Sequence, residues 1–249
     1  MFTLEDGTFP ALLKTLSDSS DEVIKRDLRL LAQISRASGP TYFAAFMANL
    51  LELFSTDRRL LENRGSLIIR QLCLSLGSSK IYDALAGIIE DDEDLEFASL
   101  LIQKLTVVLV TSPELSDLRN RLKKLENVDD QSLFCKLYRC WSHNAISVFT
   151  LCLLSQAYEH ASDLLYTISE LEVTVNLLVQ IDKLVQLIES PVFSGLRLQL
   201  LEPDRNPYLF KCLYGILMLL PQSSAFLTLK NRLDAIGPSG RQINSKSQS

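Results

Sequence analysis

The stretch that decides the fold is Phe9-Pro-Ala-Leu-Leu-Lys-Thr-Leu-Ser-Asp-Ser-Ser-Asp-Glu-Val-Ile24. An apolar run with proline in its first turn predicts a short helix over residues 9–17. The Asp/Ser turn that follows offers N-cap residues for a second helix over residues 21–37. Apolar residues recur along this second helix at intervals of three or four, at Ile24, Leu28, Leu31 and Ile34. Two helices joined by so short a turn are expected to pack antiparallel through that apolar stripe.

The same helix–turn–helix pattern recurs along the first half of the chain. The predicted pairs are residues 41–54 with 57–76 and residues 79–90 with 93–110. The spacing between pairs is roughly 30–40 residues, which is typical of helical repeat arrays. The unit resembles a HEAT repeat, and neighbouring pairs are expected to stack because one pair cannot bury its apolar face alone. The sequence thus predicts an all-α fold, a right-handed α-solenoid of HEAT-like helix pairs that ends in a compact helical cap.

Composition supports helices joined by short loops. The chain has 249 residues, of which 50 are leucine and only 9 are glycine and 8 proline. A β-sandwich or a Rossmann fold needs more glycine-rich turns than this, so both are disfavoured. The formal net charge is −5. A mildly acidic chain without a concentrated basic face is not expected to bind nucleic acid.

The second half continues with helices of less regular length. The predicted helices are 113–126, 129–140, 144–156, 158–169, 170–189, 193–201, 207–220 and 222–236. Residues 237–249 are rich in Gly, Ser, Lys and Gln and are predicted to be a disordered tail. The predicted domains are therefore HEAT-like repeats over 1–126, a C-terminal helical domain over 127–236, and the tail over 237–249.

The sequence carries no recognisable catalytic or cofactor motif. His143 and His160 are the only histidines, and they lie on different predicted helices. Cys135 and Cys140 look like a metal pair, but no second pair follows, so buried helix thiols are the favoured interpretation. Phosphate-binding glycine loops are missing as well. We expect no catalytic residue, cofactor or metal, although an unrecognised carboxylate pair stays open as an alternative.

Targeting signals are also missing from the sequence. The residues after Met1 have neither a basic nor an apolar signal-peptide region, and the longest strongly apolar run, 213–220, is too short to cross a bilayer. Five cysteines within apolar patterns indicate reduced thiols. We therefore expect a cytoplasmic protein that meets membranes only through its partners.

Basic residues gather in two modest clusters. They are Arg58, Arg59, Arg64 and Arg70, and Arg119, Arg121, Lys123 and Lys124. The favoured interpretation is that they pair with nearby carboxylates on solvent-facing helices. The alternative is contact with a partner or with anionic lipid.

From Trp141 onward the sequence resembles a known family. The strings are Asp182-Lys-Leu-Val-Gln-Leu-Ile-Glu-Ser-Pro191, Leu196-Arg-Leu-Gln-Leu-Leu201 and Leu213-Tyr-Gly-Ile-Leu-Met-Leu-Leu-Pro-Gln-Ser-Ser-Ala-Phe226. Together they look like the C-terminal domain of the ArPIKfyve family, a HEAT-repeat scaffold. The resemblance covers about residues 55 to 236 and is close in the last hundred.

The resemblance implies a non-catalytic scaffold. The family holds a PIKfyve-type lipid kinase and an opposing Sac-domain phosphoinositide phosphatase in one assembly. That assembly makes and turns over phosphatidylinositol-3,5-bisphosphate on endosomes, lysosomes and vacuoles. The C-terminal part is the region assigned to phosphatase binding and to self-association into a homo-oligomer. Family members are much longer than this chain, so kinase contacts made elsewhere are expected to be absent.

Aromatic and arginine side chains are the candidate anchors of a protein interface. The predicted interface residues are Arg197, Tyr208, Tyr214, Phe226, Trp141 and His143. Each has an alternative in ordinary packing, and a packed corner is favoured for Trp141 and His143. A transport or coat adaptor that grips extended cargo peptides is the alternative function, and ladders of charge on its inner helices would favour it.

Overall fold

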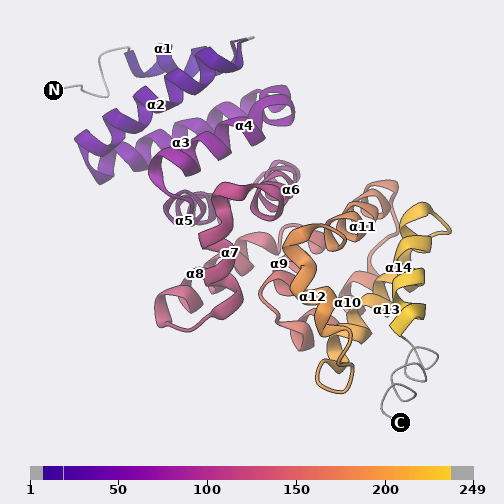
Figure 1. The fold of residues 1–249 in the computed structure, drawn as a ribbon. Helices are drawn as coiled ribbons and strands as arrows, with labels where there is room; N and C mark the ends of the chain where they lie inside the picture. The colour runs from indigo at the N-terminus through magenta and orange to yellow at the C-terminus, as the bar shows by residue number, and fades with distance from the viewer. Residues whose placement is uncertain (1–7, 19, 237–249) are drawn as a thin grey trace. The chain divides into compact units, whose positions relative to one another are not determined.

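The computed structural model describes residues 8–18 and 20–236, and all regular structure in these ranges is helical (Figure 1). Fourteen α-helices and two short 3-10 segments follow one another, without a strand among the described residues. The all-α prediction is confirmed. The chain divides into two compact units, Met1–Asn144 and Ala145–Ser249.

The first unit holds eight α-helices and one 3-10 turn within its described residues. They are α1 (Thr8–Thr15), α2 (Asp21–Ser38), α3 (Pro40–Thr56), α4 (Arg58–Leu76), α5 (Ser78–Ile89), α6 (Leu95–Thr111), η1 (Pro113–Leu115), α7 (Ser116–Lys124) and α8 (Val128–Trp141). The predicted first six helices agree with α1 to α6 to within about two residues, the ordinary uncertainty of helix ends. The single helix predicted over 113–126 was wrong, because Pro113 opens a separate tight turn before α7.

Side chains and glycines set the ends of these helices. Asp57 accepts a hydrogen bond from the backbone N–H of Leu60 at 3.1 Å and so caps the start of α4. Gly39 lies between α2 and α3 with φ +87°, a conformation that an L side chain rarely adopts. Asp129 or Asp130 was predicted to cap α8, but the cap is Asn127, which accepts from the N–H of Asp130 at 2.8 Å.

Stacking of alternate helices identifies the first unit as a solenoid. Helix α2 packs on α4 and α4 on α6, while α3 packs on α5. First and second helices of successive pairs therefore form two layers, as in HEAT-like arrays. Large fully buried side chains fill the space between them: Phe46, Phe54, Tyr82, Phe97 and Trp141.

The second unit packs around one apolar helix. Its elements are α9 (Ala145–Leu154), α10 (Tyr158–Glu170), α11 (Val175–Ile188), η2 (Pro191–Phe193), α12 (Ser194–Gln199), α13 (Pro207–Leu219) and α14 (Ser224–Ile236). Every residue of α9 after Ala145 is buried, so this helix is enclosed on all sides. Helices α10 and α11 pack against it, α13 packs on α10, and α14 covers α11 and α13.

The long helix predicted over 170–189 was wrong at its start. Helix α10 continues to Glu170, and α11 begins only at Val175. Thr174 accepts a hydrogen bond from the N–H of Leu177 at 3.1 Å, which makes it the N-cap of α11. Periodicity alone concealed this break, because the apolar spacing continues through it.

The predicted domain division stays a prediction where function is concerned. Helix α8 packs on α5 and α7, so its contacts group it with the first unit rather than with residues after 145. The predicted tail, 237–249, lies outside the described residues. The right-handed superhelical path also stays a prediction.

Candidate protein-binding surfaces

Arg197, on α12, secures the end of the neighbouring helix. Its Nη1 group donates to the backbone carbonyl of Ile188 and, at 2.7 Å, to that of Ser190. These carbonyls lie at the C-terminus of α11, where helix geometry leaves acceptors without a partner. The guanidinium therefore satisfies acceptors that would otherwise be lost and complements the negative end of the helix dipole.

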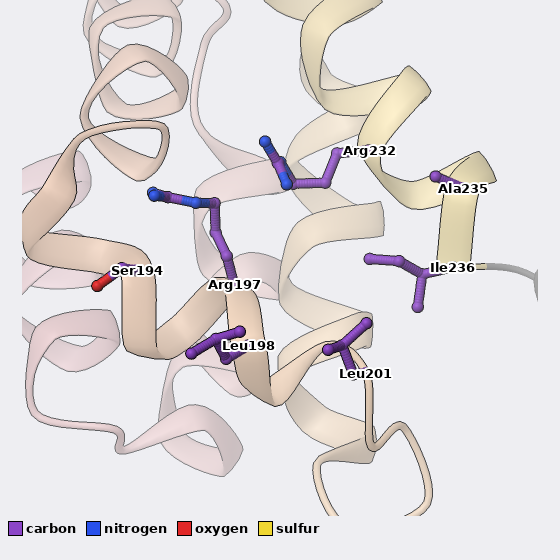
Figure 2. A pocket seen from close by; sticks show the side chains of 7 residues that line it. All are labelled: Ser194, Arg197, Leu198, Leu201, Arg232, Ala235 and Ile236. Atoms are coloured by element: carbon purple, nitrogen blue, oxygen red, sulfur yellow. The ribbon is translucent and has the colours of Figure 1, made fainter.

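The same arginine lines a groove between α12 and α14 (Figure 2). The groove has a volume of about 460 Å³ and is lined by Ser194, Arg197, Leu198, Leu201, Arg232, Ala235 and Ile236. Leu198 and Leu201 are each 65% exposed, which is unusual for leucines three residues apart. The surface of the groove is therefore mainly apolar, with two guanidinium groups at its edge.

Arg232 holds the second guanidinium group of this groove in place. Its Nε and Nη2 donate to the two carboxylate oxygens of Glu189 at 2.6 and 2.5 Å, a bidentate pair. This hydrogen bonding raises the pKa of Arg232, so the side chain stays charged. The pair joins α14 to the end of α11 and fixes one edge of the groove.

Tyr208 and Tyr214 lie on an exposed stripe of α13, together with Met218. The three side chains are 40%, 39% and 74% exposed. A hydrogen bond with Glu159, and the charge of that carboxylate, raise the pKa of Tyr208. Tyr214 stacks on Phe210 with ring centroids 6.4 Å apart. Amphipathic tyrosines on a helix face are common anchors in protein interfaces.

A second groove lies beside α11 and has a volume of about 340 Å³. Val175 and Val179, on its wall, are 79% and 44% exposed, and Val173 beyond it is 62% exposed. Exposed apolar side chains thus recur on several faces of the second unit. Surfaces of this kind mark sites of protein contact more often than sites of chemistry.

The remaining predicted residues take structural places. Trp141 is fully buried in the first unit, donates from Nε1 to the Thr106 hydroxyl at 2.9 Å, and stacks on Tyr82. His143 is half-buried in the turn after α8. Phe226 is half-buried in the first turn of α14. The structure therefore brings no more than small groups of the six predicted residues together, and their role in binding stays a prediction.

Sequence reasoning missed Leu198, Leu201 and Arg232. These leucines look like part of one buried run, since Leu196 and Leu200 beside them are buried. A signal was nevertheless available, because a helix as short as α12 cannot bury leucines on every side.

The described residues offer little chemistry for catalysis. Burial raises the pKa of Cys73, Cys140, Cys152 and Cys212 to about 12, so these thiols stay protonated near neutral pH. Cys135 is exposed whereas Cys140 is buried, so the two do not share a face. Across the described ranges, no group of three or more His, Cys, Asp or Glu side chains is placed to hold a metal ion.

Most arginines of the two basic clusters have partners, as the favoured interpretation expected. Arg58 pairs with Asp94, Arg64 with Asp21, Arg70 with Glu114, and Arg121 with Asp130. The pairing carboxylates are not the ones predicted. Arg119 is buried and bonds to backbone carbonyls instead.

Within the described part of the chain, no single helix is long and apolar enough to cross a membrane. One pair of segments, Leu95–Thr111 with Pro113–Lys124, passes by length and composition but is bent by 88°.

The fold and its surfaces define a class: a helical-repeat protein whose apolar and tyrosine-bearing faces are suited to binding other proteins. Comparison with known proteins is consistent with this class. A family described as the "Vacuolar protein 14 C-terminal" region, and named for the binding of a partner protein, matches residues 58–236. No solved structure matches the chain.

Three curated relatives match almost the whole chain. The chain is 52% identical to "Protein VAC14 homolog" of Schizosaccharomyces pombe over 94% of its length, and 46% identical to "Protein VAC14 homolog" of Arabidopsis thaliana over 92%. It is 41% identical to "Vacuole morphology and inheritance protein 14" of Saccharomyces cerevisiae over 93%. The chain belongs to the ArPIKfyve/VAC14 family, which confirms the resemblance. It spans less than a third of the length of these relatives, at 29%, 31% and 26%.

Proposed function

We propose that this chain is the phosphatase-binding part of a non-catalytic scaffold that regulates the synthesis and turnover of phosphatidylinositol-3,5-bisphosphate. The observation that carries the proposal is the match of residues 58–236 to a family whose description names the binding of a partner protein. The family resemblance identifies that partner as the Sac-domain phosphatase. Exposed apolar and tyrosine side chains on the second unit support the proposal, since a scaffold needs such surfaces.

The scaffold would act by raising effective concentration. A PIKfyve-type kinase and a Sac-domain phosphatase held in one assembly meet the same small pool of lipid, so each acts on the other's product without a diffusive search. The relatives' names refer to the vacuole, which supports action at vacuolar or endolysosomal membranes through the partners. Kinase binding and self-association are part of the proposal.

Chromatography with light scattering tests the phosphatase and oligomer claims separately. The chain has a mass of 28.0 kDa, and a multiple of that mass at micromolar concentration is expected for the chain alone. Addition of the purified Sac-domain phosphatase is expected to give a larger species that contains both proteins. A strictly monomeric chain would remove the self-association claim alone. Separate elution of the two proteins at low salt would remove phosphatase binding.

Purified chain is also expected to release no phosphate from phosphoinositide vesicles. Turnover that follows the chain through successive chromatographic steps would overturn the non-catalytic claim.

A further inference from the structure

An internal sequence motif occurs once in each unit and makes the same turn in both. In the first unit it reads Ser112-Pro-Glu-Leu-Ser-Asp-Leu-Arg-Asn-Arg-Leu122, and in the second Ser190-Pro-Val-Phe-Ser-Gly-Leu-Arg-Leu-Gln-Leu200. Each copy starts with a 3-10 turn at its proline and continues into a short helix, α7 or α12. The shared spacing allows the two copies to be compared residue by residue.

The core positions of the motif serve the fold in the same way in both copies. Leu118 and Leu196 are buried, and so are Leu122 and Leu200. The arginine is equivalent as well: Arg119 donates to the carbonyls of Leu109 and Ser112, as Arg197 does to those of Ile188 and Ser190. These residues are therefore explained by the turn itself.

The outward positions differ in chemistry. Asn120 in the first copy corresponds to Leu198 in the second, and Lys123 corresponds to Leu201. Asn120 is exposed, and both leucines are 65% exposed. Since the same turn forms with polar residues at these positions, the fold does not require leucine there. Two exposed leucines oppose solubility unless a partner covers them.

Charge at the groove indicates what that partner brings. Two guanidinium groups, those of Arg197 and Arg232, meet one carboxylate, that of Glu189. Acids close by in the sequence have partners of their own, Glu202 with Arg205 and Asp234 with Lys230. In the hydrogen bonds described, Arg197 uses Nη1 and Arg232 uses Nε and Nη2, so further N–H groups can meet an acceptor. A carboxylate is the acceptor that guanidinium groups bind best.

We propose that the groove between α12 and α14 is a docking site for a segment of the phosphatase in which apolar side chains flank a carboxylate. The apolar side chains lie on Leu198, Leu201 and Ile236, and the carboxylate meets Arg197 and Arg232. A volume of about 460 Å³ accommodates a few side chains rather than a whole domain, which suits a short segment. The inference rests on the proposed function, because the phosphatase supplies the segment.

The test transfers the first copy's outward residues to the second. Leu198→Asn with Leu201→Lys places in α12 the residues that α7 already carries, so the turn is expected to form. The matched control is Leu227→Asn, which changes a 57% exposed leucine of α14 that does not line the groove. Thermal unfolding by circular dichroism checks that both variants stay folded.

Binding to the purified Sac-domain phosphatase is measured by biolayer interferometry. The double variant is expected to bind about tenfold or more weakly, as when central contacts of an interface are removed, while the control binds like the wild type. Leu198→Asn with Leu201→Glu is expected to bind more weakly still, because the new carboxylate repels the acidic segment. Stronger binding by the Glu variant than by the Lys variant would overturn the acidic character of the segment.

The remaining outcomes also decide the proposal. Equal binding by the wild type and a folded double variant would overturn the groove while leaving phosphatase binding intact. Loss of oligomer mass without loss of phosphatase binding would assign the groove to contact between copies and overturn the proposal. A wild-type chain that does not bind the phosphatase removes the proposed function and this inference together.

Discussion

Two short segments, α7 with its preceding turn and α12 with its preceding turn, share one motif but face different surroundings. Arg119 is only 9% exposed, and Arg121 beside it bonds to Asp130 of α8 and to Ser79 of α5. The second copy has glutamine at the position of Arg121, and its Arg197 borders an open groove. The difference shows that the motif supplies the turn, whereas neighbouring helices decide whether its outer face is covered.

The environment of each arginine follows from this difference. Burial lowers the pKa of Arg119, although the charges of Tyr82 and Glu114 act in the opposite direction. Arg197 performs the same hydrogen bonding at the surface. An equal substitution in the two copies therefore separates the energy of the turn from the energy of its burial.

The largest effect is expected from Arg119→Met. Its loss leaves the carbonyls of Leu109 and Ser112 without a donor in a buried place, so we expect a loss of about 2–4 kcal/mol in the free energy of unfolding. Arg197→Met is expected to cost about half as much, because water can reach its carbonyls. Urea unfolding, with hydrogen exchange of α6 and α11 to assign the transition, measures both. Equal losses would show that burial adds nothing.

A smaller effect is expected from Glu114→Val, which places the second copy's residue in the first. Burial raises the pKa of Glu114, but hydrogen bonding to Arg70 and the nearby arginine charges outweigh it, so the pKa lies below its ordinary value. We expect Glu114→Val to cost about 0.5–1 kcal/mol at pH 7. Urea unfolding at several pH values measures the difference.

The pH dependence of that loss has a definite sign. A carboxyl group with a lowered pKa stabilises the fold above its unfolded pKa, and this stabilisation disappears as pH falls through the folded value. The gap between wild type and Glu114→Val is therefore expected to narrow in acid below about pH 4. Glu114→Gln, which keeps the shape and removes the charge, is the control. A gap that is constant with pH would contradict the ion pair with Arg70.

A stabilising effect is expected from Gly195→Asp, which introduces the counterpart of Asp117. A Cβ atom at Gly195 meets no atom within 4 Å, so the change fits without strain. Less freedom in the unfolded chain and an acid in the first turn of α12 are together expected to add about 0.5–1.5 kcal/mol. Gly195→Ala separates the two contributions. A lower melting temperature for both variants would contradict the open surroundings of this position.

The smallest effect is expected from Ser190→Ala. The Ser190 hydroxyl oxygen is buried and has no hydrogen-bond partner in the structure. Because no bond is lost, we expect the free energy of unfolding to change by less than about 0.5 kcal/mol, towards greater stability. Thermal unfolding measures it. A loss above about 1 kcal/mol would show that the hydroxyl has a partner, such as an ordered water molecule.

Much of the fold could be predicted from local signals. Leucine spacing, the Gly39-Pro40 break and the capping Asp57 each act over a few residues, so they identified α2, α3 and α4 closely. The start of α11 was missed because the apolar spacing runs through Thr174, and only the cap ends the continuity. The division at Asn144 was missed because it depends on which neighbours α8 contacts.

The candidate surfaces were less predictable. Tyr208 and Tyr214 were chosen by residue type and lie on the surface, whereas Trp141 was chosen in the same way and lies in the core. Residue type cannot separate these cases, because an aromatic ring is equally favourable in a core and at an interface. Arg197 was predicted as an interface residue, and its hydrogen bonds to α11 became evident only in three dimensions.

The sequence by itself determined that the chain is helical, that its helices pair, and which family it belongs to, since these depend on spacing and identity along the chain. Only the tertiary structure decided that Leu198 and Leu201 are exposed while Leu196 and Leu200 are buried. The physical reason is that exposure is a property of neighbours brought together by folding, and four leucines in one short segment look alike until those neighbours are in place.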